Sequence, residues 1–192
     1  MDSRRTRVLI EIALSVALAA VLAMITVWRM PQGGSVSLNM LPLFIIALRR
    51  GTGAGLAAGA LYGAVDFLVN PYIVHWIQPI LDYPVAYGLV GLSGVVSRPL
   101  KAALSQAAYG ASVAWAAAGI ALGGLGRYIA HFASGVVFFG SFAPEGQPVW
   151  LYSALYNTYV PVSAAAALAA AIVILPVLER AMPSRVSDSA GT

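Results

Sequence analysis

Residues 113–139 read VAWAAAGIALGGLGRYIAHFASGVVFF, an apolar run longer than the roughly 20 residues that a membrane-spanning helix requires. The run carries two ionisable side chains, Arg127 and His131, four positions apart. Ionisable groups are costly inside a bilayer, and proteins usually keep them there to hold something. This stretch therefore predicts a spanning helix that contributes to a binding site.

The rest of the chain has the same membrane character. Of its 192 residues, 60% are hydrophobic and 9% are charged, and the mean hydropathy is +0.83. These values exclude a soluble globular domain. Ala and Leu dominate and the alternation of a β-barrel is absent, so the spans are predicted to be helices. The lack of cysteine excludes disulfides and thiolate chemistry.

Working outward from residues 113–139, five further segments are predicted to be helices. They cover residues 8–28, 38–48, 52–69, 80–96 and 149–178. The second is too short to cross a bilayer untilted, and it follows a Pro-Gly loop at residues 30–37. We therefore expect an all-α integral membrane protein with six transmembrane helices, in which residues 1–192 form a single transmembrane substrate-binding domain.

The basic residues predict how these helices are oriented, because cytoplasmic loops carry an excess of Lys and Arg. With the N-terminus inside, the outer loops carry only Arg29. The inner side collects Arg4, Arg5, Arg7, Arg49, Arg50, Arg98, Lys101, Arg180 and Arg185. Both termini are thus predicted to be cytoplasmic, in a multi-pass protein of the cell membrane surrounded by lipid. The net charge of +4 reflects this topology, and nothing predicts nucleic-acid binding.

This topology brings polar and aromatic side chains from four helices to the outer leaflet. They are Asp66, Asp82, Tyr83, His131, Phe139, Tyr152, Tyr156 and Asn157. Such a convergence predicts a site that opens to the outer face.

The two acidic residues of this group each have two interpretations. Asp82 lies next to Pro84, and aspartate with a nearby proline is common in the first turn of a helix. A carboxylate in a low dielectric either pairs or protonates, so Asp82 is also a candidate counter-ion for an organic cation, and the two interpretations can hold together. Asp66 either pairs internally with Arg127 or contacts a ligand.

His131 is either a packed residue bonded to a neighbouring helix or a ring that contacts a bound heterocycle. Gly135 falls on the same helix face one turn later and would leave room for a ligand. With two histidines in the chain and no paired-ligand spacing, we expect no metal site.

Tyr152, Tyr156 and Tyr159 form one stripe, which is either an interfacial aromatic belt or part of a site. Pro161 removes the helical hydrogen bond to the carbonyl of Asn157, so the helix is predicted to be disturbed there. A disturbed helix at Asn157 would suit a binding site.

Small residues recur at four-residue spacing on two helices. Gly55, Gly59 and Gly63 form a stripe, and Ala13 and Ala17 form a pair. Such spacing is typical of close helix packing. For the alanine pair, the spacing leaves open whether the packing is internal or against another subunit.

Several motifs together resemble the thiamine-specific substrate-binding subunit (S component, ThiT type) of energy-coupling factor transporters. They are MPQGGSVS at 30–37, LDY at 81–83, LGRYIAH at 125–131, SGVVFFGSFAP at 134–144, and PVWLYS at 148–153 with Tyr156 and Asn157. The resemblance covers nearly the whole chain. It implies a six-helix fold that captures thiamine with high affinity near the outer face, without catalysis or a cofactor. Import would require a separate transmembrane coupling subunit and two ATP-binding subunits.

The resemblance also assigns roles to residues. The substrate-binding positions are Asp82, Tyr83, His131, Gly135, Phe139, Tyr152 and Asn157. Ala13 and Ala17 match a pair that contacts the coupling subunit, and residues 30–37 match a loop that covers the site. Some family members have glutamate in place of Asp82 and tryptophan in place of Phe139. The resemblance assigns no role to Arg127, Tyr156 and Tyr159, which we interpret as packing or interface residues.

Other functions remain open at this point. The same architecture can serve another vitamin or heterocyclic cation. An intramembrane enzyme would use Asp82 and His131 as acid and base and would alter its ligand. A purely structural subunit would have no use for the polar cluster of the outer leaflet.

Overall fold

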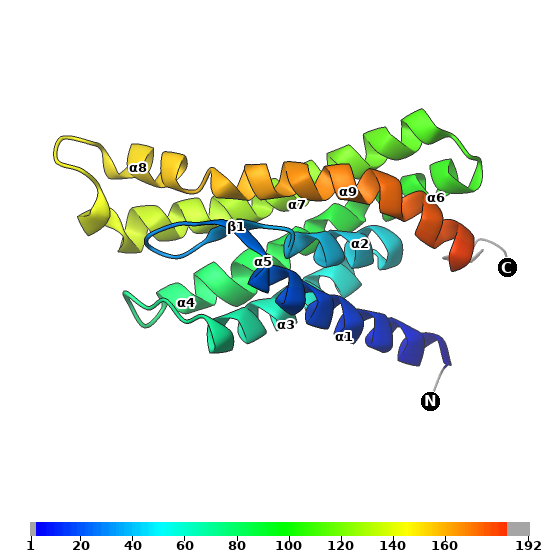
Figure 1. Cartoon of the computed structure of the whole chain (residues 1–192), viewed down its shortest axis with the longest axis horizontal. Helices are drawn as coiled ribbons and strands as arrows, with labels where there is room; N and C mark the ends of the chain where they lie inside the picture. Colours follow the sequence, from blue (N-terminus) through cyan, green and yellow to red (C-terminus); the bar gives the residue numbers. More distant parts are fainter. Residues whose placement is uncertain (1–2, 184–192) are drawn as a thin grey trace, which may run out of the picture.

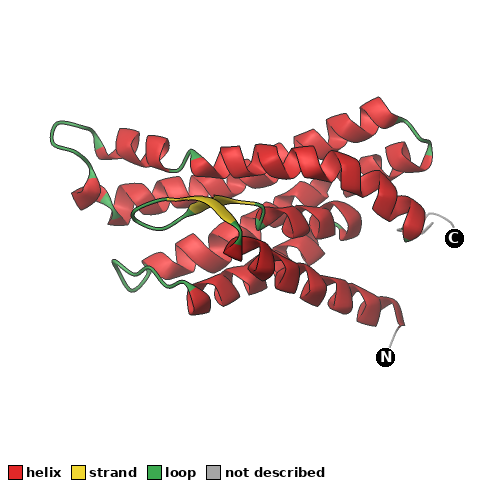
Figure 2. Cartoon of the chain, in the orientation of Figure 1, coloured by secondary structure: helices red, strands yellow, loops and turns green. Residues whose placement is uncertain are grey.

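The computed structural model describes residues 3–183, and Arg185, one of the predicted cytoplasmic residues, lies outside them (Figure 1). The described chain is helical except for one β-hairpin (Figure 2). Its elements are α1 (Ser3–Met24), β1 (Thr26–Arg29), β2 (Ser35–Ser37), α2 (Met40–Arg50), α3 (Thr52–Val69), α4 (Gln78–Ile80), η1 (Leu81–Val85), α5 (Ala86–Leu89), η2 (Val90–Val96), α6 (Ser97–Ser105), α7 (Tyr109–Phe138), η3 (Gly140–Phe142), α8 (Val149–Tyr156) and α9 (Tyr159–Ala181).

Within residues 3–183, five helical stretches are long and apolar enough to cross a membrane. They are Arg5–Met24, Thr52–Val69, Gln78–Ser105, Tyr109–Phe138 and Val149–Ala181. The short α2 is the sixth helix, and most of its side chains, from Met40 to Leu48, are buried among the others. The prediction of an all-α membrane protein with six helices is confirmed, with α2 as a central core helix.

The end of the first predicted helix was wrong. Helix α1 ends at Met24, and Thr26–Arg29 instead pairs antiparallel with Ser35–Ser37, with Arg29 opposite Ser35. Residues 30–34 turn the chain between the strands, where Gly33 and Gly34 both adopt φ of +84°, a conformation that favours glycine. A short apolar run does not distinguish a strand from the last turn of a helix.

The fourth predicted helix was too short, because helical structure continues from Gln78 to Ser105. Along this stretch the backbone changes from α to π geometry at Leu81–Val85 and to 3₁₀ geometry at Val90–Val96. Pro84 lies in the π segment and has no N–H to donate to a regular α-helix. Asp82 lies in the same segment, and π segments are frequent at functional sites.

The glycine stripe of α3 is a packing surface, as predicted. A Cβ on Gly59 would lie 2.1 Å from the carbonyl oxygen of Tyr87, and one on Gly63 would lie 2.4 Å from that of Tyr83. Only glycine permits α3 to approach the neighbouring backbone so closely. The contact at Gly63 holds the π segment, and with it Asp82, against α3.

Both described ends of the chain lie at one end of the bundle, and the hairpin and α8 lie toward the other (Figure 1). Near the termini, Arg49 Nη2 donates a hydrogen bond to the carbonyl oxygen of Met182 at 2.8 Å. Arg50 Nε donates to Glu11 Oε2 at 2.6 Å, in an ion pair that ties α2 to α1. Basic side chains therefore gather at the end of the bundle that holds the termini.

Candidate functional site

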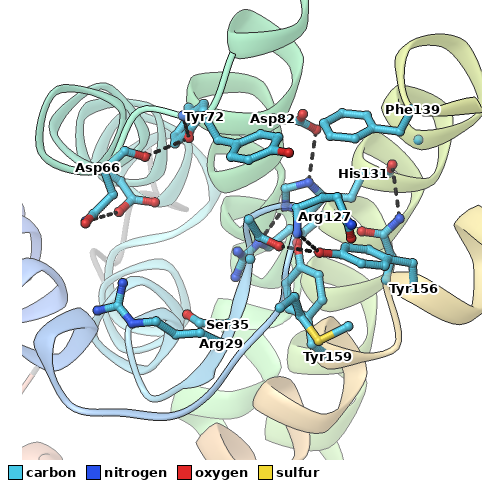
Figure 3. Close-up of a pocket in the computed structure, with 18 of the residues that line it drawn as sticks. Arg29, Ser35, Asp66, Tyr72, Asp82, Arg127, His131, Phe139, Tyr156 and Tyr159 are labelled. Atoms are coloured by element: carbon cyan, nitrogen blue, oxygen red, sulfur yellow. Dashed lines mark hydrogen bonds and ion pairs between the residues drawn. The ribbon is translucent and has the colours of Figure 1, made fainter. Parts of the chain in front are cut away.

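A cavity of about 340 Å³ opens at the end of the bundle away from the termini (Figure 3). Its walls come from the hairpin, the end of α3, η1, the second half of α7, α8 and the start of α9. The volume is in the range of small-molecule sites. All seven predicted substrate-binding residues line it: Asp82, Tyr83, His131, Gly135, Phe139, Tyr152 and Asn157.

A chain of hydrogen bonds connects three ionisable residues of the cavity. Arg127 Nε donates to His131 Nε2 at 3.2 Å, and His131 Nδ1 lies 3.1 Å from Asp82 Oδ1. A guanidinium is a donor only, so His131 Nε2 must accept. The proton of the neutral imidazole therefore sits on Nδ1, which donates to Asp82.

The second oxygen of Asp82 is also engaged, because Gln78 Nε2 donates to Oδ2 at 2.6 Å. Asp82 lies four residues after Gln78, one turn inside the helical stretch, and its bonds are to side chains. The helix-start interpretation of Asp82 was therefore wrong. For His131, both interpretations hold, since the ring bonds to a neighbouring helix and also lines the cavity.

Arg127 is buried but lines the cavity, contrary to our interpretation of it as a packing or interface residue. Its guanidinium carbon lies 4.0 Å from the centroid of the Tyr87 ring and 6.0 Å from that of Tyr159. Its Nη1 has no hydrogen-bond partner in the described part of the chain. The ion pair between Arg127 and Asp66 that the sequence left open does not form within residues 3–183.

The last spanning stretch is interrupted where Pro161 predicts it. Helix α8 ends at Tyr156 and α9 begins at Tyr159, and the carbonyl oxygen of Asn157 accepts from Val160 N at 3.0 Å. The Asn157 amide Nδ2 donates to the carbonyl oxygens of Ser153 at 2.9 Å and His131 at 3.3 Å. The interruption thus places the Asn157 side chain against α7, at the wall of the cavity.

Gly135 lines the cavity for a different reason than the one we expected. A Cβ at this position would lie 2.1 Å from Ser153 Oγ, so the space beside the glycine is filled by α8. Ser153 Oγ donates to the carbonyl oxygen of Phe132 at 2.8 Å, which fixes the contact between the two helices. The glycine therefore sets the distance between α7 and α8 rather than making room for a ligand.

The loop between β1 and β2 closes one side of the cavity. Gln32 N donates to the Tyr156 hydroxyl at 2.7 Å, and that hydroxyl donates to the carbonyl oxygen of Gly33 at 3.0 Å. The Tyr152 hydroxyl donates to Gln32 Oε1 at 3.4 Å. Tyr156 is therefore not a membrane-belt residue, because it holds this loop over the cavity.

The remaining wall is aromatic. The rings of Phe139 and Tyr72 are nearly parallel, with an interplanar angle of 15° and centroids 6.1 Å apart. The Tyr83 hydroxyl donates to the carbonyl oxygen of Asn70 at 2.8 Å and accepts from Tyr72 N at 2.9 Å. Tyr83 thus holds the loop after α3, and this loop brings Tyr72 to the cavity.

Sequence reasoning missed several residues of the cavity and misjudged three more. The missed residues are Asn39, Tyr72, Gln78 and Tyr87. The misjudged ones are Arg127, Tyr156 and Tyr159, which we interpreted as packing or interface residues. For Gln78 a signal existed, because it lies four positions before Asp82 and faces it on a helix. Tyr72 lies in a loop, where no periodicity indicates the direction of a side chain.

A family model described as "Thiamine transporter protein (Thia_YuaJ)" matches residues 9–185. The chain is 44% identical over 156 residues to "Thiamine transporter ThiT" of Bacillus subtilis (strain 168), covering 79% of this chain and 81% of that protein. It is 32% identical over 154 residues to "Thiamine transporter ThiT" of Lacticaseibacillus paracasei, covering 78% and 77% of the two chains.

The fold also matches a solved structure, described as native-SAD phasing for ThiT from Listeria monocytogenes. The TM-score is 0.81 at 31% sequence identity, and the match covers 94% of this chain and 97% of that one. This chain belongs to the thiamine transporter protein family (Thia_YuaJ).

Proposed function

We propose that this protein is the thiamine-binding S component of an energy-coupling factor transporter and that it captures thiamine in the cavity described above. The observation that carries this proposal is the cavity itself, which all seven residues predicted to bind thiamine line. The protein is a membrane transporter rather than an enzyme, since it belongs to a family of transporters. The intramembrane enzyme based on Asp82 and His131 is therefore not retained.

The lining chemistry suits the two rings of thiamine. The thiazolium ring is a permanent cation, and aromatic faces such as those of Phe139 and Tyr72 attract a desolvated cation by about 2 kcal/mol. The aminopyrimidine ring presents hydrogen-bond donors and acceptors along its edge. Asp82, His131 and Asn157 offer both kinds of partner in the same cavity, in positions that the hydrogen bonds described above hold in place.

The proposed orientation has both termini in the cytoplasm and the cavity open to the outside. Arg49 and Arg50 lie at the end of the bundle that holds the termini, and Arg29 lies in the hairpin toward the other end. An excess of basic residues marks the cytoplasmic side of a membrane protein. Residues 1–192 would then act as one substrate-binding domain that receives thiamine from outside.

The proposed partners are a transmembrane coupling subunit and two ATP-binding subunits. Helix α1 is the least buried of the five apolar spans, since few of its side chains are covered by the rest of the protein. Ala13 and Ala17 lie on its exposed side, where their small side chains permit another helix to approach closely. The face of α1 around these two alanines is therefore the proposed docking surface for the coupling subunit.

Thiamine binding is best tested by calorimetry on the purified protein in detergent. None of the four tryptophans lines the cavity, so their emission is a less direct signal. We expect saturable binding of unmodified thiamine that Asp82→Asn and His131→Ala both weaken. Glu145→Gln, in an exposed loop outside the cavity, is the matched control and should bind as the unaltered protein does. Absence of binding to the unaltered protein would refute the assignment.

Docking is tested separately, by thiamine uptake in cells that also produce the coupling and ATP-binding subunits. We expect Ala17→Trp to abolish uptake while the purified variant still binds thiamine. Ala114→Trp, on an exposed part of α7, is the control for a bulky side chain facing outward. Equal uptake by the two variants would show that α1 is not the docking surface.

A further inference from the structure

The charged side chains that line the cavity do not balance one another. Besides the neutral His131, those of residues 3–183 are Asp66, Asp82, Arg127 and Arg29. Arg29 is exposed on the hairpin, so solvent and salt screen its charge. The enclosed groups are therefore one guanidinium and two carboxylates, which leave one negative charge in excess.

Asp82 does not supply this excess charge, because its carboxylate is already engaged on both oxygens. Gln78 donates to one oxygen at 2.6 Å and His131 donates to the other at 3.1 Å. Through the imidazole, the same carboxylate is coupled to the Arg127 guanidinium, whose Nε donates to His131. Asp82 is thus already held by hydrogen bonds within the protein, and the single charge of Arg127, which also acts on Asp66, balances only one of the two carboxylates.

Asp66 is the carboxylate that remains. It lies near the end of α3, and Figure 3 shows it on the other side of the cavity from His131 and Phe139. Its Oδ1 accepts a long hydrogen bond of 3.5 Å from Asn70 Nδ2. A carboxylate in such an environment gains most from a cationic partner, since burial without one is costly.

We infer that Asp66 is a ligand-binding residue that supplies the negative charge balancing a monocationic ligand, while Asp82 serves as a hydrogen-bond acceptor for a heterocycle. This inference rests on the proposed function, in which the cation is the thiazolium ring of thiamine. It makes Asp66 a specificity residue, because it favours a cation over an uncharged molecule of the same shape. Without the Asp66 carboxylate, the charges of Asp82 and Arg127 would sum to zero in the empty cavity. A bound monocation would then leave one positive charge in excess.

The test compares two ligands on matched variants by calorimetry. The ligands are thiamine and an uncharged analogue with a thiophene ring in place of the thiazolium. Asp66→Asn is expected to weaken thiamine binding roughly tenfold to a hundredfold, as for the loss of one opposite charge near a partly covered cation, and to leave the analogue nearly unaffected. Asp66→Glu keeps the charge and is expected to retain most of the preference for thiamine. Glu145→Gln controls for the loss of one negative charge outside the cavity.

The outcomes separate the inference from the proposed function. If the unaltered protein does not bind thiamine, the proposed function fails. If it does and Asp66→Asn binds thiamine equally well, the role of Asp66 is overturned and the function stands. Equal weakening of both ligands, including loss of both through misfolding, would show that Asp66 is a structural residue and would also overturn the inference.

Discussion

Arg127 and His131 are joined by a hydrogen bond of 3.2 Å from the guanidinium Nε to the imidazole Nε2, and this bond determines which ring nitrogen carries the proton. Because Arg127 occupies Nε2, the imidazole presents Nδ1–H to Asp82. Arg127 thus acts on the site through His131. It is therefore a positioning residue. The four-residue spacing between Arg127 and His131, which places them on one helix face, is visible in the sequence.

Replacing Arg127 with methionine removes the donor to Nε2 and frees the imidazole to change its tautomer. We expect thiamine affinity to fall about tenfold, the cost of one hydrogen bond to a charged group. The ¹⁵N chemical shifts of His131 should change from those of a single Nδ1–H tautomer to those of a mixture. Arg127→Lys retains a donor, so it should keep part of the thiamine affinity and part of the Nδ1–H tautomer of His131. An unchanged ¹⁵N spectrum in the methionine variant would contradict this role.

Replacing Gly135 with alanine places a Cβ where Ser153 Oγ now lies, at 2.1 Å. Helix α8 must then move away from α7, and overpacking of this kind costs about 1–3 kcal/mol. We expect a lower melting temperature in detergent and weaker thiamine binding, because Asn157 moves with α8.

The control for Gly135 is a second substitution at its neighbour. Ser153→Gly clears the space, so the double variant Gly135→Ala/Ser153→Gly should recover part of the stability that Gly135→Ala loses. A double-mutant cycle measures this coupling. Additive losses would show that the two residues do not compete for the same space.

Replacing Tyr156 with phenylalanine removes the hydroxyl that holds the loop at residues 30–34. That hydroxyl accepts from Gln32 N and donates to the carbonyl oxygen of Gly33. With two hydrogen bonds lost, we expect bound thiamine to dissociate roughly tenfold faster. A chase of labelled thiamine with unlabelled ligand measures the rate. Tyr109→Phe, exposed and outside the cavity, should dissociate at the original rate, and an equal effect in both variants would exclude a role for the loop.

Replacing Glu11 with glutamine breaks the ion pair with Arg50 at the end of the bundle that holds the termini. Both side chains are largely covered, with 24% and 16% of their surfaces exposed. We expect a loss of about 1–3 kcal/mol of stability, seen as a lower melting temperature, because a covered guanidinium is left without its partner. Thiamine affinity should be unchanged, since neither residue lines the cavity. A parallel loss of affinity would show that the two ends of the bundle are coupled.

Part of the site was predictable because its signals are local. Residues 134–144 and 148–153 carry motifs that place Gly135, Phe139 and Tyr152 at the site by resemblance, and all three line the cavity. The interruption at Asn157 follows from the missing N–H of Pro161 four residues later. In each case the cause lies within a few residues of its effect.

Other features were not predictable, because their partners are distant in the sequence. The hydrogen bonds between the Tyr156 hydroxyl and the loop at residues 30–34 join positions more than 120 apart. The strand at Thr26–Arg29 was missed for another reason, because it forms only when Ser35–Ser37 folds back beside it and a short apolar run does not show this pairing. Periodicity describes one element at a time and does not indicate which surfaces meet.

The sequence by itself determined that this protein is a bundle of membrane helices and that its polar side chains gather at one end. Hydropathy decides this, because a membrane span must form its backbone hydrogen bonds internally. Ionisable groups are also costly in a bilayer and are usually found there only at functional positions. Only the tertiary structure decided what each polar residue does. It gave both oxygens of Asp82 hydrogen-bond donors, Gln78 and His131, and left Asp66 with a long hydrogen bond of 3.5 Å from Asn70. Hydrogen bonds depend on tenths of an ångström between side chains from different helices, and packing alone determines those distances.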